Sequence, residues 1–367
     1  MVEAIFPSQR PHVAGRRISL WKASALVEAP THPRPLRSRA KFLLRALTRL
    51  GLTNVWLSRL VQPDLAPLWA TRPRLATKLQ RPYVSAEWGP AERFAALLGH
   101  YELLPGLLAA GALQAIYTTG LDLVRLKNTS TGRQLTLRLF YQDQFEKEGE
   151  LTLAVMDDAT GLPLAGLTFC LARSGGRRVA IVGGLQAFPD PRIRTLIHDV
   201  AKEMHGLRPK AFALWGLRQI AVAWQIERLE GVCDGQHIYR HRHKRRNIAA
   251  CYDEFWRESD GCQLPGGGWE LPLQPRPRRR EELKASRRKQ HERRDALLGG
   301  LQTELLAALA DLAPGPQAAR ALAAGPREFS YASRESAPPV AIEPPGEIAV
   351  NQRQPAATLS PARSHAY

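Results

Sequence analysis

The stretch VAIVGGLQAFPDPRIRTLIHDVAKEMHGLRPK, residues 179–210, decides the fold. It begins with an apolar run typical of a buried strand, and this strand is predicted to end at the paired glycines Gly183 and Gly184. After a polar turn, Asp190 suits the cap of a helix whose apolar residues recur at helical spacing until Gly206. The stretch therefore predicts a strand, a turn and an amphipathic helix.

The residues before this stretch have the alternating pattern of strands. Apolar and polar residues alternate over residues 135–139, 151–155 and 164–171, with tight turns between them. Strands joined by such turns pair antiparallel. After the stretch, residues 209–225 predict a helix that is apolar on nearly all sides, and residues 226–232 are predicted to extend the sheet.

These patterns predict an α+β fold: an N-terminal irregular helical region, a central mainly antiparallel sheet with two or more packed helices, and a basic C-terminal helix. Prolines interrupt the helices of the first third of the chain. We divide the chain into a flexible lead-in (1–37), a helical region (38–118), an α+β core domain with the C-terminal basic helix (119–312) and a disordered tail (313–367).

The chain has 367 residues and a formal net charge of +18, which favours polyanionic partners such as nucleic acid or an anionic membrane surface. Part of this charge also fits the Ala-, Arg- and Pro-rich composition of a GC-rich genome. Residues 38–50 form a basic amphipathic pattern, which indicates either a membrane or phosphate contact or a core helix with a solvated basic face. The sequence shows neither a transmembrane segment nor a secretory signal, so we expect a cytoplasmic protein, either free or peripheral at the inner membrane.

Six strings occur in the order of a known family. They are EGELTLAV (148–155), GGLQ (183–186), HGLRPK (205–210), HIY (237–239), YDEFW (252–256) and RRKQHERR (287–294). Together they resemble the bacterial VirK/YbjX family, which is a domain of unknown function. The resemblance implies a role in virulence, envelope stress and antimicrobial-peptide tolerance, and it carries over no catalytic residue. Ala187 departs from the glycine expected there, as do Ser259 and Asp260 from a plain glycine pair.

The residues that we place in a candidate pocket come from these strings. They are Gly183, Gly184, Gln186, His205, Arg208, His237, Tyr239, Tyr252, Asp253 and Trp256. The glycine-containing turn is either purely structural or, because it leads into a helix N-terminus, a site for an anion such as a phosphate, which the carboxylate of Asp190 would repel. A meander, a glycine-containing turn and a helix are similar in order to acyl-CoA-dependent N-acyltransferases. An acyltransferase-like enzyme is therefore the alternative function. It predicts coenzyme A or acyl-CoA as the ligand, and no other cofactor is indicated.

Basic residues after His237 form a second candidate contact. We assign anion binding to this ribbon, namely Arg240, Arg242, Lys244, Arg245 and Arg246, with a lipid or a nucleic acid as the anionic partner. The same positive charges would repel a zinc ion, so no metal site is predicted. His205 and Arg208 could act as a general base and an anion clamp, or could simply stabilise a helix end. No standard catalytic motif is present, which leaves enzymatic activity open.

Overall fold

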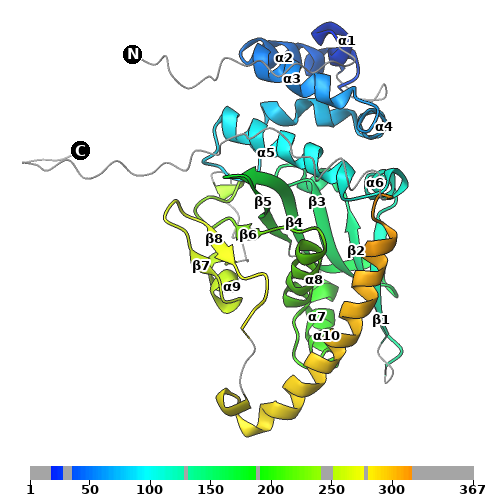
Figure 1. Ribbon diagram of the computed structural model, residues 1–367, viewed down its shortest axis with the longest axis vertical. Helices are drawn as coiled ribbons and strands as arrows, with labels where there is room; N and C mark the ends of the chain where they lie inside the picture. The colour runs from blue at the N-terminus through cyan, green and yellow to red at the C-terminus, as the bar shows by residue number, and fades with distance from the viewer. Residues whose placement is uncertain are drawn as a thin grey trace, which may run out of the picture. The chain divides into compact units, whose positions relative to one another are not determined.

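The computed structural model describes residues 18–27, 35–127, 131–186, 191–240, 251–276 and 280–315. These residues belong to one compact unit, residues 1–331. Helices come first in the chain, an eight-stranded sheet follows, and a long helix packs against the sheet at the end (Figure 1). The predicted α+β class is therefore confirmed. None of the described helices is long and apolar enough to cross a membrane.

Short helices fill the first third of the chain. They are α1 (Leu20–Ala25), α2 (Pro35–Leu47), α3 (Leu50–Leu60), α4 (Ala66–Thr71), η1 (Pro73–Gln80), α5 (Pro90–Leu103), η2 (Leu104–Gly106) and α6 (Ala110–Ile116). Helix α1 and the start of α2 fall within residues 1–37, where we expected an unpacked lead-in. Ser19 caps α1 by accepting from the Lys22 N–H, and Ala23 is buried. A six-residue helix is too short to show a period in the sequence.

The sheet has the order β1-β2-β3-β4-β5-β6-β8-β7. Its strands are β1 (Leu121–Lys127), β2 (Gln134–Phe140), β3 (Leu151–Asp157), β4 (Leu162–Ser174), β5 (Arg177–Gln186), β6 (Arg228–Gly231), β7 (Cys262–Gln263) and β8 (Trp269–Leu271). All neighbours pair antiparallel, as predicted for the meander, except β5 and β6, which are parallel. Helices α7 (Pro191–Glu203) and α8 (Pro209–Ala223) form the crossover that a parallel pair requires.

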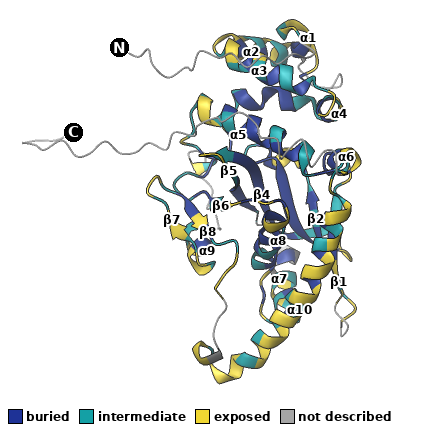
Figure 2. Cartoon of the chain, in the orientation of Figure 1, coloured by how far each residue is buried: buried dark blue, intermediate teal, exposed yellow. Residues whose placement is uncertain are grey.

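Helices α8 and α10 (Ala285–Asp311) bury the middle of the sheet. Helix α8 contacts β3 and β4, and α10 contacts α8 and β1 (Figure 1). Gly216 on α8 permits this approach, because a Cβ there would lie 2.5 Å from a methyl carbon of Leu137. In α10 only Leu301, Leu305 and Leu309 are buried, and the first half of the helix is largely exposed (Figure 2). The predicted basic C-terminal helix is thus anchored by its second half.

The end of β5 differs from the expectation. We expected the strand to end at the glycines, whereas β5 continues to Gln186 and stays paired with β4. Thr168 pairs with Gly184 and Phe169 pairs with Val182, so Gly183 is the extra residue of a β-bulge. The glycines therefore serve close packing within a strand. The predicted helix cap at Asp190 lies outside the described residues.

A buried ion pair joins the helical region to the sheet. Lys78 Nζ on η1 lies 2.6 Å from Oε1 of Glu150, just before β3, and the two side chains are 1% and 0% exposed. The Tyr101 hydroxyl donates to the other carboxylate oxygen at 2.6 Å and accepts from the Tyr117 hydroxyl at 3.1 Å. Burial raises the pKa of Glu150, and the nearby Lys78 charge opposes that rise. Removing either partner would leave the other charge buried without a counter-ion, which would destabilise the fold.

A buried histidine pairs with β4 beyond the end of its pairing with β3. Pairing of β4 with β3 extends only to the Leu151 and Phe169 pair, and the N–H of Leu171 donates to Nδ1 of His100 at 3.1 Å. His100 on α5 is fully buried, and burial lowers its pKa well below the usual 6.5. The imidazole is therefore neutral and acts as an acceptor.

We predict that Glu150→Gln lowers the free energy of unfolding by about 3–5 kcal/mol, because it leaves the Lys78 charge buried without a counter-ion. Urea denaturation measures the change. Arg125→Ala, which breaks the exposed Arg125–Asp122 pair, should cost less than about 1 kcal/mol. The double variant Lys78→Met/Glu150→Leu should recover most of the loss. A loss in Glu150→Gln as small as that in Arg125→Ala would contradict the assigned role.

We predict a second, pH-dependent contribution from His100. Its folded pKa is depressed, so the unfolded chain binds one more proton below pH 6.5 and stability falls as the pH decreases through that value. Between pH 7 and 5.5 this group should contribute a loss of about 1 kcal/mol. His100→Gln keeps an acceptor for Leu171 and should show a pH dependence that is weaker by that amount. Equal pH dependence in both proteins would contradict the prediction.

Candidate functional site

Glu148 lies at the centre of a buried polar cluster beside the end of β5. It sits between η3 (Asp143–Phe145) and β3, and its side chain is 5% exposed. The amide of Gln186 donates to Oε2 of Glu148, and Nε2 of His237 lies 3.3 Å from Oε1. Nε2 of His237 is also 3.0 Å from the Tyr252 hydroxyl. A carboxylate, an imidazole and a phenol are thus connected by hydrogen-bonding distances.

The two glycines of β5 make room for Glu148. A Cβ on Gly183 would lie 2.2 Å from the backbone oxygen of Glu148, and a Cβ on Gly184 would lie 2.3 Å from Oε2. Val84 packs against Gly183 and donates its N–H to the oxygen of Lys147 at 2.6 Å, with a φ of 55°. A β-branched residue rarely adopts this conformation, and such strain is concentrated at functional sites.

His237 reaches the cluster from the loop after β6. This loop pairs with the segment before α5: Ser85 and His237 form a β-bridge, and the Ala86 N–H donates to the oxygen of Gln236 at 2.8 Å. The imidazole is buried, and its Nδ1 has no hydrogen-bond partner among the described residues. The ring of Tyr239 lies 5.7 Å from that of His237, and the ammonium of Lys147 lies over the Tyr239 ring.

Tyr252 is the first residue of α9 (Tyr252–Glu258), and it covers the edge of β5 beyond its pairing with β6. Pairing of β5 with β6 ends at Val182, apart from the Val232 N–H that donates to the Val182 oxygen. Further along β5, the Tyr252 hydroxyl accepts from the N–H of Leu185 at 2.9 Å. Burial and then the Glu148 charge raise the pKa of Tyr252 well above its usual value, so the phenol stays protonated.

Two other predicted pocket residues anchor α9. Asp253 Oδ1 accepts from Trp269 Nε1 on β8 at 2.8 Å, and Trp256 Nε1 donates to the oxygen of Val232 at 2.9 Å. Trp256 also packs on Gly231, where a Cβ would lie 2.6 Å from the indole. Both side chains therefore hold α9 against the end of the sheet, so that its first residue, Tyr252, reaches the cluster.

His205 and Arg208 line a different cavity, of about 600 Å³. Its other lining residues are Gly206, Glu258, Arg287, Gln290, His291 and Arg294. Those from α10 recur at intervals of three or four residues and share one helix face. Arg208 pairs with Glu258, and Arg294 also lies 3.7 Å from the exposed Asp295 carboxylate outside the lining, so the lining itself carries three arginines and one carboxylate. This basic cavity therefore suits an anion. His205 and Gly206 have φ values of 53° and 81°, the left-handed conformation that ends α7.

The predicted pocket residues thus divide between two places. Gly183, Gly184, Gln186, His237 and Tyr252 surround Glu148, and Tyr239 adjoins them, whereas His205 and Arg208 belong to the basic cavity. Helix α9 has one end in each place, because it begins at Tyr252 and ends at Glu258. In the ribbon assigned to anion binding, Arg240 donates to the oxygen of Gly235 at 2.7 Å. The other ribbon residues, Arg242, Lys244, Arg245 and Arg246, lie outside the described residues.

The sequence reasoning missed Glu148 as a site residue. The available signal was a pair of glutamates, Glu148 and Glu150, on either side of Gly149 and directly before an apolar strand. Both side chains are buried, and a Cβ on Gly149 would lie 2.6 Å from the backbone of Phe169. Within the described parts of the chain, we find no group of three or more His, Cys, Asp or Glu side chains arranged to hold a metal ion.

Comparison with known proteins gives a family match without a described activity. Residues 31–307 match a family described as "Protein of unknown function (DUF535)". The chain is 32% identical over 272 residues to "Uncharacterized protein YbjX" of Escherichia coli strain K12, covering 73% of this chain and 82% of that protein. It is 26% identical over 125 residues to an "Uncharacterized protein" of Haemophilus influenzae, covering 34% of this chain and 42% of that protein. No solved structure matches.

We predict opposite effects for two glycine-to-alanine substitutions. Gly183→Ala would push a methyl group into the backbone oxygen of Glu148, so unfolding should become easier by roughly 1–3 kcal/mol. Gly299→Ala on α10 meets nothing within 4 Å, so it should stabilise by roughly 0.5–1 kcal/mol through helix propensity. Denaturant unfolding of the two variants checks the prediction. A neutral effect at residue 183 would mean that the bulge does not hold Glu148.

Proposed function

This chain belongs to the DUF535 family, and we propose that it is an acyltransferase-like enzyme whose acyl-CoA donor lies in the opening between β5 and β6. One observation carries the proposal: the parallel pairing ends at Val182, while β5 continues to Gln186 beside the buried cluster of Glu148, His237 and Tyr252. A stretch of β5 that no neighbouring strand pairs on this side, where the Tyr252 hydroxyl holds the Leu185 N–H, therefore lies beside a proton-transfer group.

The strand edge supports an extended donor. Beyond Val182, β5 is paired on its β4 side only, and on the other side Leu185 donates to the Tyr252 hydroxyl. An extended ligand that carries amide groups can add to such an edge by forming the hydrogen bonds of a missing strand. The pantetheine arm of coenzyme A is an extended chain of this kind. Successive side chains of β5 point to opposite faces of the sheet, so the two faces of a bound donor would lie beside alternate β5 side chains.

The buried cluster supports the chemistry of acyl transfer. An acceptor amine or hydroxyl attacks the thioester carbonyl, the new C–N or C–O bond forms, and the C–S bond breaks. The proton that leaves the acceptor passes to His237, whose Nε2 is 3.3 Å from the Glu148 carboxylate. Tyr252 relays this proton, because its hydroxyl passes its own proton to the departing thiolate as it takes one from His237 Nε2, which lies 3.0 Å away. The cluster ends the cycle in its starting protonation state.

A second candidate function is the binding of a phosphorylated polyanion in the basic cavity. The observation that favours it is the set of three arginines, Arg208, Arg287 and Arg294, around about 600 Å³ with one opposing carboxylate. Arginine binds phosphate through paired N–H donors. Under this proposal the anion belongs either to a lipid headgroup or to a nucleic acid. The resemblance to VirK/YbjX proteins adds the proposal that the chain acts in envelope stress, antimicrobial-peptide tolerance or virulence at the cytoplasmic side of the inner membrane.

We predict that coenzyme A and acetyl-CoA at millimolar concentration raise the melting temperature of the full chain. Tyr252→Phe should keep this shift but slow the turnover of acetyl-CoA at least 100-fold, because it removes the proton donor and leaves the strand edge intact. Chromatographic measurement of released coenzyme A gives the rate without interference from the exposed Cys251 and Cys262 thiols.

Arg208→Ala, in the basic cavity, is the matched control and should keep both the melting shift and the turnover. The absence of any shift with either ligand would reject the acyltransferase proposal. If heparin binds, and Arg287→Glu/Arg294→Glu abolishes that binding while coenzyme A has no effect, the polyanion function would take its place.

A further inference from the structure

The large apolar side chains that are exposed gather near the start of the chain. Among the described residues, six of seven lie between residues 20 and 50, and the seventh is Val222 on α8. The six are Trp21 (67% exposed), Leu26 (50%), Leu36 (75%), Leu44 (69%), Leu47 (64%) and Leu50 (44%). Single exposed leucines are ordinary, but six large apolar side chains exposed on or next to three consecutive helices point to an interaction surface.

Helix α2 has two apolar faces. Phe42 and Ala46 form the inner face, and both are buried in the core. The outer face consists of exposed residues at helical spacing, namely Leu36, Ala40, Leu44 and Leu47, while Leu43 lies between the two faces and packs against the core. Phe42 and Leu44 are separated by about 200° at 100° per residue, so the outer face points away from the core contact. The fold of this chain therefore leaves Leu36, Leu44 and Leu47 exposed.

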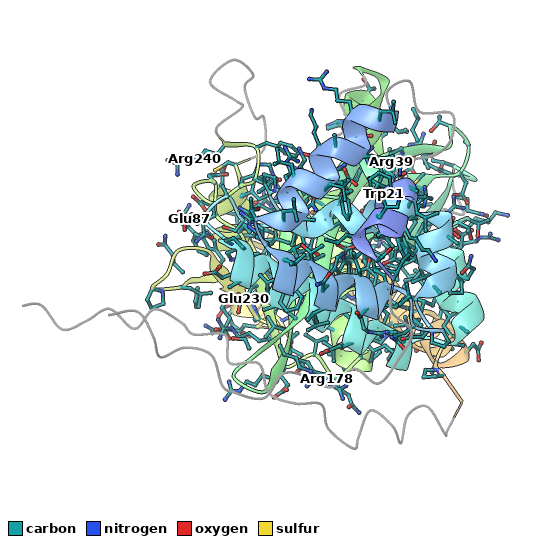
Figure 3. All side chains as sticks on the ribbon, turned by 90° about the horizontal axis from the view of Figure 1, so that it is seen from above. Trp21, Arg39, Glu87, Arg178, Glu230 and Arg240 are labelled. Carbon is teal, nitrogen blue, oxygen red and sulfur yellow. The ribbon has the colours of Figure 1, made fainter. Side chains whose placement is uncertain are left out.

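Cations border the outer face, and acids are absent from it. Arg37, Lys41 and Arg45 are exposed and follow one another at intervals of four along α2. Across the described residues 18–27 and 35–50 there are six basic residues and no Asp or Glu, and none of the six has an ion-pair partner in the described part of the chain. The guanidinium of Arg39 lies 5.1 Å from the ring centroid of Trp21 (Figure 3). Tryptophan and arginine together suit the headgroup region of a bilayer.

From these observations we infer that α1, α2 and the start of α3 dock on an anionic lipid bilayer. The leucines of the outer face enter the boundary between headgroups and acyl chains, and the cations contact the anionic headgroups. An apolar groove of about 550 Å³, lined by Leu26, Ile18 and Trp69 among others, continues the apolar surface. Nucleic acid would match the cations but would leave the leucines and Trp21 in water, so a lipid surface fits both halves of the pattern.

Vesicle flotation tests this docking with the full chain. The wild-type protein should float with vesicles of 7:3 phosphatidylcholine and phosphatidylglycerol and bind at least tenfold more weakly to pure phosphatidylcholine. Leu36→Ser/Leu44→Ser/Leu47→Ser should weaken binding to the anionic vesicles at least tenfold, as should Arg37→Glu/Lys41→Glu/Arg45→Glu. Because all six positions are exposed, both variants should keep the wild-type melting temperature, which confirms that they fold.

Two matched controls separate this surface from general properties of the chain. Val222→Ser removes an exposed apolar side chain elsewhere, and Lys284→Glu/Lys289→Glu/Arg293→Glu makes the same change in charge on and beside α10. Both should bind the anionic vesicles within twofold of wild type. Equal binding by all variants, or no flotation of the wild type, would overturn the inference.

A second copy of the chain is the competing occupant. In that case the wild type would sediment as a dimer without lipid, and the triple leucine variant would sediment as a monomer that still floats; this result would also overturn the docking. The test is independent of the acyltransferase proposal, because coenzyme A binding is measured without lipid and involves no residue of α1 or α2. Failure of either proposal therefore leaves the other standing.

Discussion

The structure depends on an ion pair that is closed to water. Lys78 comes from the irregular helices and Glu150 from the chain just before β3, so their contact fixes the helical region on the sheet. Tyr101 and Tyr117 extend the pair into a buried hydrogen-bonded network. Removing either charge leaves the other uncompensated, which is far more costly than losing an exposed pair. Helices interrupted by prolines thus gain a fixed position that their own regularity does not provide.

The position of Glu150 in turn determines that of Glu148. The two carboxylates are two residues apart with Gly149 between them, and Gly149 fits against the backbone of Phe169 on β4. Glu148 is thereby directed to the bulge of β5, where Gly183 and Gly184 leave space for its backbone and its carboxylate. One buried acid stabilises the junction of helices and sheet, and its neighbour reaches His237 and Gln186. The packing that holds the fold together therefore also positions the candidate site.

The sequence predicted the fold class and the antiparallel meander because those depend on local periodicity. It also predicted five of the residues that surround Glu148, among them Gln186, His237 and Tyr252. It could not show that Glu148 is their centre, because a glutamate before a strand has no period and its burial follows from contacts far along the chain. Nor could it separate His205 from Gln186, since the distance between two loops depends on the crossover through α7 and α8. The glycine pair was predicted to end the strand in a turn, because glycine is favoured both in turns and in β-bulges.

Tyr252 constrains any ligand that enters the opening beside β5. Its phenol accepts from the Leu185 N–H, in the place where an adjacent strand would supply a carbonyl, and so leaves no buried donor unpaired. A ligand carbonyl that replaced the phenol would gain this hydrogen bond, and the Tyr252 hydroxyl, now 3.0 Å from His237, would lose its contact with Leu185. The exchange costs little, because one hydrogen bond replaces another of similar strength. Under the acyltransferase proposal, binding at this strand edge would free the phenol as a proton donor and would thereby link donor binding to acyl transfer.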